Sequence, residues 1–216
     1  MKILAVGDLH GRYQAIPGLL DSVHPDLMVL NGDLTHFGTP EDLEHLFALV
    51  RDVPAWFNWG NCDPAPVAAG IRESGRDLAA GLCLKEQELG FFGLSGSNKT
   101  PFHTPSEYSE DVLYQSLRAG YAAVKHCRRT LLFSHVPPYK TKTDRTAFFL
   151  HAGSRALRRF LQENALSMCV CGHIHEARGQ DLVGETPVYN IGAFKNKAYA
   201  VITVTPRAIS LAMDRL

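Results

Sequence analysis

Short runs of apolar residues recur along the chain, and each ends in a polar turn. A continuous apolar run bounded by turn residues is typical of a strand that is buried on both faces of a parallel sheet. The runs that fit this description are residues 3–6, 27–30, 55–59, 131–133 and 169–171. The pattern therefore predicts a set of buried strands at the centre of the fold.

Helical periodicity fills several of the intervals between these runs. In residues 40–51, apolar side chains recur at the spacing of one helix face. Thr39 and Pro40 match the N-cap and first position of that helix, and Asp63 and Pro64 match the same pair before a shorter one. Helices are expected over residues 12–22, 40–51, 106–119 and 153–164.

The regular alternation of strands and helices breaks near residue 75. Beyond it, clusters of Gly, Ser, Thr and Pro mark loops, and one of these loops is a candidate wall or lid for a substrate. The expected elements are strands over 82–85 and 89–94, loops over 95–105 and 136–146, and short strands over 177–213. No linker divides the chain, so the sequence predicts one α/β domain with a mixed sheet, spanning residues 1–216.

Residue types that bind metal ions occupy the turn after each apolar run. Asp8 and His10 follow the first run at positions i and i+2, which point to one face of an extended chain. A carboxylate and an imidazole aimed at one point suit a divalent transition metal. Open α/β sheets place their chemistry at the carboxyl ends of strands, so we expect the turns to meet. The other turns are Asn31-Gly32-Asp33, Gly60-Asn61-Cys62-Asp63, Ser134-His135 and Gly172-His173-Ile174-His175.

Each of these residues has an ordinary explanation when it is taken alone. Asp8 and Asp33 could be caps, Asn61 could be a left-handed turn residue, and the two histidines of the last turn could be polar turn residues. Five ligand-bearing turns, each directly after an apolar run, favour a metal site over coincidence. Asp63 differs from the others, because a helix N-cap explains it fully.

At these turns the sequence resembles the calcineurin-like metallophosphoesterase superfamily. The ordered pattern of that superfamily, D-x-H, G-D, G-N-x-[D/E], G-H and G-H-x-H, runs here from residue 7 to residue 175. Residues 134–138 and 172–179 also resemble a small-phosphodiesterase branch. Ser134 stands where glycine is common, and Cys62 stands where many members carry a catalytic histidine.

The resemblance implies a four-layer α/β/β/α sandwich, in which two mixed sheets pack face to face between helices. It also implies two divalent transition-metal ions, with Mn favoured and Fe, Zn, Ni or Co as alternatives. Asp33 would bridge the two ions, and Asn61 and His135 would also be catalytic. One ion would be held by Asp8, His10, Asp33 and His175, and the other by Asp33, Asn61, His135 and His173.

A dinuclear site of this kind implies hydrolysis of phosphate esters by a metal-bridging hydroxide. Two divalent ions, two carboxylates and one hydroxide leave about one positive charge, which matches the single negative charge of a phosphodiester. Small phosphodiesters are therefore the expected substrates. A phosphomonoesterase or nucleotidase is the alternative within the same class. A non-catalytic binding scaffold is the alternative from another class, and it is disfavoured because every ligand position holds a competent residue.

Five further residues are candidate substrate contacts, and each also has a plainer explanation. Cys62 is smaller than histidine and would leave room beside the ions for a second ester group, or it would only pack. His36, His103 and His151 lie in loops that could face the site or only face solvent. Lys140 could contact the phosphate, or it could be a solvated charge.

Composition narrows the class of protein. Basic and acidic residues balance to a net charge of zero, so a basic face for long nucleic acid is not expected. No apolar stretch has transmembrane length, so no membrane partner is expected. The five cysteines lack the spacing of a disulfide framework, and no signal peptide is recognised, so we expect reduced thiols and a cytoplasmic protein. Cys169 and Cys171 are two positions apart on an expected strand, so both should lie on one buried face. A homo-oligomer is compatible with these observations.

Overall fold

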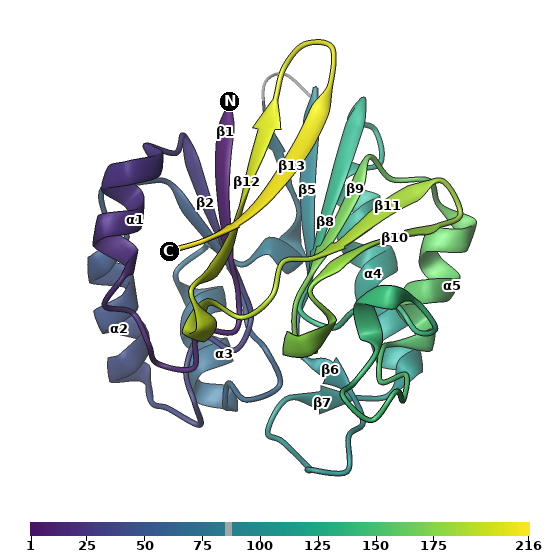
Figure 1. Cartoon of the computed structure of the whole chain (residues 1–216), viewed down its shortest axis with the longest axis horizontal. Coiled ribbons are helices and arrows are strands. Elements are labelled where there is room, and N and C mark those ends of the chain that lie inside the picture. The colour runs from purple at the N-terminus through teal and green to yellow at the C-terminus, as the bar shows by residue number, and fades with distance from the viewer. Residues whose placement is uncertain (85–87) are drawn as a thin grey trace.

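Two mixed sheets pack face to face in the computed structural model, which describes residues 1–84 and 88–216. Helices cover the outer face of each sheet, so the fold has four layers (Figure 1). Between the sheets lies one apolar cluster, to which Ile3 and Val29 of one sheet and Phe91 and Phe133 of the other belong. This arrangement confirms the expected α/β/β/α sandwich.

The first sheet is built around three parallel strands. Its order is β13, β12, β1, β2 and β3, and β12 pairs antiparallel with both β1 and β13. The strand bounds are Lys2–Val6 for β1, Leu27–Asn31 for β2, Ala55–Asn58 for β3, Ala198–Val204 for β12 and Ile209–Arg215 for β13. Its outer face packs against α1 (Ile16–Val23), α2 (Pro40–Leu49) and α3 (Ala65–Glu73).

The second sheet has four parallel central strands and an antiparallel strand at each edge. Its order is β10, β11, β9, β8, β5 and β4. The strand bounds are Leu82–Leu84 for β4, Leu89–Leu94 for β5, Arg129–Ser134 for β8, Met168–Cys171 for β9, Gly179–Val183 for β10 and Thr186–Asn190 for β11. Its outer face packs against α4 (Glu110–Val124) and α5 (Arg155–Glu163).

Smaller elements lie in the connections. A short parallel pair, β6 (Ser97–Asn98) and β7 (Glu107–Tyr108), replaces part of the loop expected over 95–105. Single 3₁₀ turns occupy Leu78–Ala80, Lys142–Asp144, His175–Ala177 and Phe194–Asn196. Lys85, the expected last residue of the strand over 82–85, lies outside the described residues.

Helix α1 begins later than the sequence pattern predicts. The prediction places its start at residue 12, whereas the helix begins at Ile16 with Pro17 in its first turn. Proline has no N–H to donate and is tolerated only in that turn, so Pro17 fixes where the helix can begin.

The start of α4 is also later than expected. Ser109 caps the helix by accepting a hydrogen bond from the backbone N–H of Val112, with Glu110 and Asp111 in the first turn. Ser106, at the expected start, instead donates a hydrogen bond to the backbone oxygen of Asp63. The Ser-Glu pair at 106 and 107 therefore serves the loop before the helix.

The cysteines behave as small apolar residues within the fold. All five thiols are free, and Cys169 and Cys171 are fully buried beneath α5, as their alternation predicts. The Sγ atoms of Cys83 and Cys127 lie 2.7 Å apart, a contact that no spacing in the sequence indicates. Among the described residues, no helix is both long enough and apolar enough to pass through a membrane.

Candidate metal centre

The five polar turns meet at the carboxyl ends of the strands that precede them. The turns after β1, β2 and β3 come from the first sheet, and those after β8 and β9 come from the second. The centre therefore lies where the two sheets adjoin, and each sheet contributes some of its residues.

One group of ligand-type side chains consists of Asp8, His10 and His175. The Nε2 atom of His175 lies 3.2 Å from Oδ1 of Asp8 and 3.4 Å from Nε2 of His10. All three donor atoms lie within 4.8 Å of one another. A carboxylate oxygen and two imidazole nitrogens at this spacing could hold one divalent transition metal.

A second group consists of Asp33, His135 and His173, whose donor atoms also lie within 4.8 Å of one another. The amide oxygen of Asn61 lies 2.9 Å from Nε2 of His135, so Asn61 belongs to this group as well. His135 and Asn61 are both buried. This set of one carboxylate, two imidazoles and an amide oxygen could hold a second ion.

Asp33 stands between the two groups. Its Oδ2 atom lies 3.5 Å from Nε2 of His10, and its Oδ1 atom lies 3.5 Å from Nε2 of His135. One carboxylate therefore presents one oxygen to each group. The structure thus brings all seven sequence-predicted ligands together, in the two sets that the resemblance implies.

The protonation states suit metal ligands. Burial lowers the pKa of His10 and of His173 to about 4, so both imidazoles are neutral at pH 7. Burial would raise the pKa of Asp8, but the hydrogen bond from His175 and the neighbouring histidines lower it to about 2. A metal ion needs neutral imidazoles and ionised carboxylates, so the low pKa values of His10, His173 and Asp8 favour metal binding.

Three glycines have no side chain where the candidate ligands need space. A Cβ atom on Gly60 would lie 2.1 Å from Oδ1 of Asp33, and one on Gly172 would lie 2.4 Å from Oδ2 of Asp8. A Cβ atom on Gly32 would lie 2.3 Å from Nδ1 of His135. Any larger residue at these positions would displace a ligand, so the glycines are part of the centre.

Four of the candidate ligands have left-handed backbone conformations. The φ angles of Asp8, His10, Asp33 and His173 are 53°, 48°, 46° and 64°. This region is unfavourable for residues other than glycine, and such strain concentrates at functional sites. The sharp turns aim these side chains at the centre.

Asn61 is oriented by residues that the sequence pattern did not single out. Its amide nitrogen donates to Oγ1 of Thr104 (2.9 Å), which donates in turn to Oε1 of Glu107 (2.7 Å). The amide oxygen of Asn61 is thereby directed towards His135. Glu107 was expected at a helix start, so no local signal pointed to this role.

Asp63 does not cap a helix, contrary to the prediction. Pro64 occupies the N-cap of α3, and the buried Asp63 carboxylate accepts hydrogen bonds from Leu34, Thr35 and Gly60. Burial and the charge of Asp33 raise the pKa of Asp63 to about 6. Asp63 therefore holds the loops that carry Asp33 and Asn61 against each other.

Two buried asparagines join the sheets beneath the centre. Asn31 donates to the backbone oxygen of Ser134 (2.9 Å), and Asn58 donates to that of Phe133 (2.7 Å) and to Oδ1 of Asn31 (2.9 Å). These bonds fix β2 and β3 relative to β8. The relative position of the two ligand groups depends on them.

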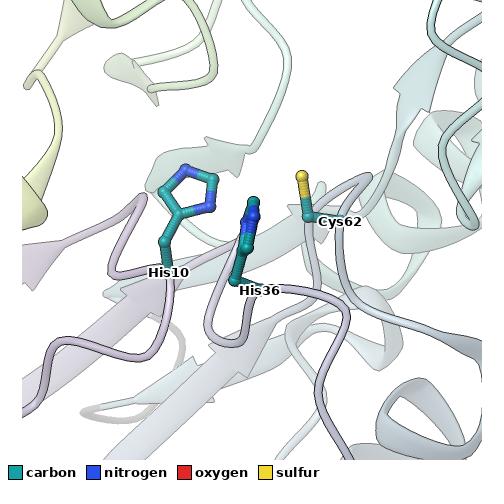
Figure 2. Close-up of side chains that lie close together, drawn as sticks. All are labelled: His10, His36 and Cys62. Atoms are coloured by element: carbon teal, nitrogen blue, oxygen red, sulfur yellow. The ribbon is translucent and has the colours of Figure 1, made fainter.

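Cys62 and His36 lie beside the centre. Figure 2 shows the side chains of His10, His36 and Cys62 directed into one region, and their donor atoms lie within 4.8 Å of one another. The His36 ring is exposed and lies 5.4 Å from the His10 ring, centroid to centroid. His36 is therefore exposed to solvent and also adjoins the centre, and substrate contact by His36 or Cys62 stays a prediction.

The remaining substrate candidates lie farther along the loops. His151 lines a cavity next to the centre, and its Nδ1 atom lies 2.7 Å from Oδ1 of Asp144. Lys140 is exposed, with its ammonium group 5.9 Å from the centre of the Tyr139 ring. His103 is exposed on the loop between β6 and β7. Substrate contact by these residues stays a prediction.

Comparison with known proteins gives matches over nearly the whole chain. An uncharacterized protein of Methanocaldococcus jannaschii is 36% identical over 196 residues, covering 88% of this chain and 87% of the relative. A crystal structure of a protein from Thermus thermophilus has a TM-score of 0.74 at 17% identity, covering 98% and 97% of the two chains. A dimetal phosphatase from Danio rerio has a TM-score of 0.73 at 12% identity, covering 99% and 95%.

The structural matches establish the fold alone, because their sequence identities are low. The sequence model of the family described as calcineurin-like phosphoesterase matches residues 1–177, which contain all five ligand-bearing turns. The chain therefore belongs to the calcineurin-like phosphoesterase family.

Proposed function

We propose that the protein is a dinuclear metal-dependent hydrolase of phosphate esters, with a preference for small phosphodiesters. Membership of the family implies divalent metal ions and the hydrolysis of phosphate esters. The number of ions, their identity and the preference for diesters are parts of the proposal.

The observation that carries the proposal is the placement of Asp33. Its two oxygens face two separate sets of imidazoles, at 3.5 Å on each side. Oδ1 of Asp33 also accepts a hydrogen bond from the backbone N–H of Cys62 (2.8 Å), which holds the carboxylate in place. The imidazoles around Asp33 are arranged as two sets that share one carboxylate, which supports a bridged pair of ions.

Bound divalent ions would supply Lewis-acid chemistry, which lowers the pKa of water and offsets the negative charge of a phosphate ester. The chain holds the ligands in place through Asn61, which Thr104 orients, and through the loops that Asp63 joins. Because only Asp8 and Asp33 in the ligand sets are anionic, the loaded centre would retain a positive charge and attract a phosphate group.

Cys62 is unsuited to act as a nucleophile or as a proton donor. Burial, followed by the carboxylates of Asp33 and Asp63, raises the pKa of its thiol above the usual range. A neutral thiol is a weak hydrogen-bond donor. The residue therefore contributes small size rather than acid chemistry, and this favours diesters over monoesters that need a protonated leaving group.

The proposal is tested by metal analysis coupled to a substrate panel. Purified protein is expected to bind two Mn²⁺ ions per chain by elemental analysis and to hydrolyse bis(p-nitrophenyl) phosphate faster than p-nitrophenyl phosphate. A chelator should abolish the activity, and Mn²⁺ should restore it. Two bound ions without hydrolysis of any cyclic nucleotide, aryl diester or monoester would favour the scaffold alternative.

A second prediction concerns the reaction class. Replacing Cys62 with histidine should raise kcat/KM for p-nitrophenyl phosphate relative to bis(p-nitrophenyl) phosphate by about tenfold, equivalent to ~1.4 kcal/mol at the transition state. The imidazole would fill the space of the second ester group, which only the diester carries. Both substrates release p-nitrophenolate, so protonation of the leaving group does not affect this ratio.

The matched control is Cys62→Ser, which replaces the thiol with a slightly smaller hydroxyl group and adds no imidazole. Its ratio of monoesterase to diesterase activity is expected to equal that of the parent protein. Metal content is measured for each variant. If Cys62→His also leaves the ratio unchanged within about twofold, well below a tenfold effect, Cys62 only packs.

A further inference from the structure

A cavity of about 670 Å³ opens beside the candidate metal centre. Asn61 and His173, which belong to the second ligand group, form part of its wall. The rest of the wall comes largely from two loops, one before β7 and one between β8 and α5. A molecule whose phosphate lay at the centre would extend its ester group into this cavity.

Large apolar side chains line the cavity and are exposed to solvent. Phe102 is 83% exposed, Phe148 is 85% exposed and Leu150 is 66% exposed. Exposed aromatic side chains gathered around a concave surface mark a binding site, because solvent exposure of apolar area is unfavourable until a ligand covers it. The two phenylalanines come from different loops, and both line the same cavity.

The loop that carries Phe102 is held firmly by one carboxylate. Glu107 accepts hydrogen bonds from the backbone N–H and the hydroxyl of both Thr100 and Thr104. Burial would raise the pKa of Glu107, but these hydrogen bonds lower it to about 2. Phe102 lies between the two threonines in the sequence, so its exposed ring projects from a hydrogen-bonded turn.

The loop that carries Phe148 has a similar anchor. The buried Asp144 carboxylate accepts hydrogen bonds from the backbone N–H groups of Lys140, Thr141 and Gly153. The loop is also fixed to the turn after β9, because the N–H of Ala147 donates to Oε1 of Glu176 (2.8 Å). This second exposed ring is therefore pre-organised as well, and binding would need little further ordering.

We propose that Phe102 and Phe148 form an aromatic clamp that binds a flat, aromatic ester group of the substrate. The inference rests on the proposed function, because the phosphate at the metal centre directs the ester group into the cavity. Offset or edge-to-face contact with two rings favours a planar aromatic ester group over an alkyl ester group on the same phosphate. The substrate class is thus an aryl or heteroaryl phosphate ester.

The test compares two phosphonates that cannot be hydrolysed and that differ only in the organic group. Phenylphosphonate and methylphosphonate are titrated into the Mn²⁺-loaded protein by calorimetry. Phenylphosphonate is expected to bind about tenfold more tightly, equivalent to ~1.4 kcal/mol. The Phe102→Ala and Phe148→Ala variants should reduce this ratio to less than about threefold, and methylphosphonate affinity should stay unchanged.

The matched control is Phe149→Ala. Phe149 is also exposed (71%), but it lines a different cavity and lies over the guanidinium of Arg145, 4.8 Å from ring centre to Cζ. This variant is expected to keep the full phenyl-to-methyl ratio. Equal ratios in the parent protein and in the Phe102→Ala and Phe148→Ala variants would overturn the clamp, while binding of both phosphonates would leave the metal centre supported.

A second measurement does not depend on metal. The fluorescence of the aromatic anion 1-anilinonaphthalene-8-sulfonate is recorded with metal-free protein. Its enhancement should fall at least about threefold in the Phe102→Ala, Phe148→Ala double variant and persist in Phe149→Ala, because only the former loses apolar area in the cavity. If neither phosphonate binds but this loss is seen, the two rings still bind an aromatic ligand, and the proposed function fails together with the assignment of a phosphate ester as that ligand. If the dye signal is the same in all proteins, the clamp is wrong.

Discussion

Replacing Asp33 with alanine is expected to abolish phosphoesterase activity and to lower the occupancy of both metal sites. The carboxylate presents one oxygen to His10 and the other to His135, each at 3.5 Å, so its loss removes a ligand from each ion at once. A fall in kcat/KM of at least about a thousandfold, ~4 kcal/mol, is expected. Elemental analysis of the purified variant gives the metal content directly.

His135→Ala is the comparison that isolates the bridge. His135 belongs to the second group alone, so this variant should lose the second ion and retain the one near Asp8, His10 and His175. Asp33→Asn keeps an oxygen to accept the hydrogen bond from the backbone N–H of Cys62 (2.8 Å), and it separates ligand loss from loop disruption. Retention of two ions by Asp33→Ala would contradict the bridging role.

Gly60→Ala is also expected to lower both activity and metal binding, although glycine has no side chain to bind a metal. The added Cβ atom would lie 2.1 Å from Oδ1 and 2.2 Å from the backbone nitrogen of Asp33. The backbone atom cannot rotate away, so the turn that carries Asp33 must move. A displacement near 1 Å costs about a hundredfold in rate, and we expect kcat/KM to fall by at least that factor, with weaker binding of both ions.

The control for this substitution is Gly18→Ala. Gly18 lies within α1, and its added Cβ atom would meet nothing within 4 Å. The same chemical change there is expected to stabilise the protein by about 0.5–1 kcal/mol and to leave kcat/KM unchanged. Thermal unfolding of both variants shows whether Gly60→Ala still folds. Full activity of Gly60→Ala would show that the turn tolerates the displacement.

The candidate ligands could be identified from the sequence because their signals are local. Each ligand follows an apolar run within a few residues, and parallel strands end at a common edge. Knowing only that Asp8 and Asp33 end neighbouring parallel strands is therefore enough to expect them near each other, whereas His135 follows a strand of the other sheet. The four-layer arrangement needed the family resemblance as well, because periodicity alone cannot say how two sheets pack.

The supporting residues were not predictable, because their partners are distant in the sequence. Asp63 has a local cap signal before Pro64, but its carboxylate bonds to residues near position 35. Asn58 reaches the backbone of Phe133, 75 positions away, and no periodicity marks such a bond. Glu107 has a helix-start signal but instead orients Asn61 through Thr104. For Asp63 and Glu107, a tertiary hydrogen bond outweighs the local preference.

The left-handed turns at Asp8, His10, Asp33 and His173 give the protein an evolutionary trade-off. Each such residue costs about 1–3 kcal/mol of folding free energy, against a total stability of only about 5–15 kcal/mol. Glycine at any of the four positions would relieve the backbone and remove a ligand. Selection for stability alone would therefore erode the centre, and only selection for what the centre does can keep it.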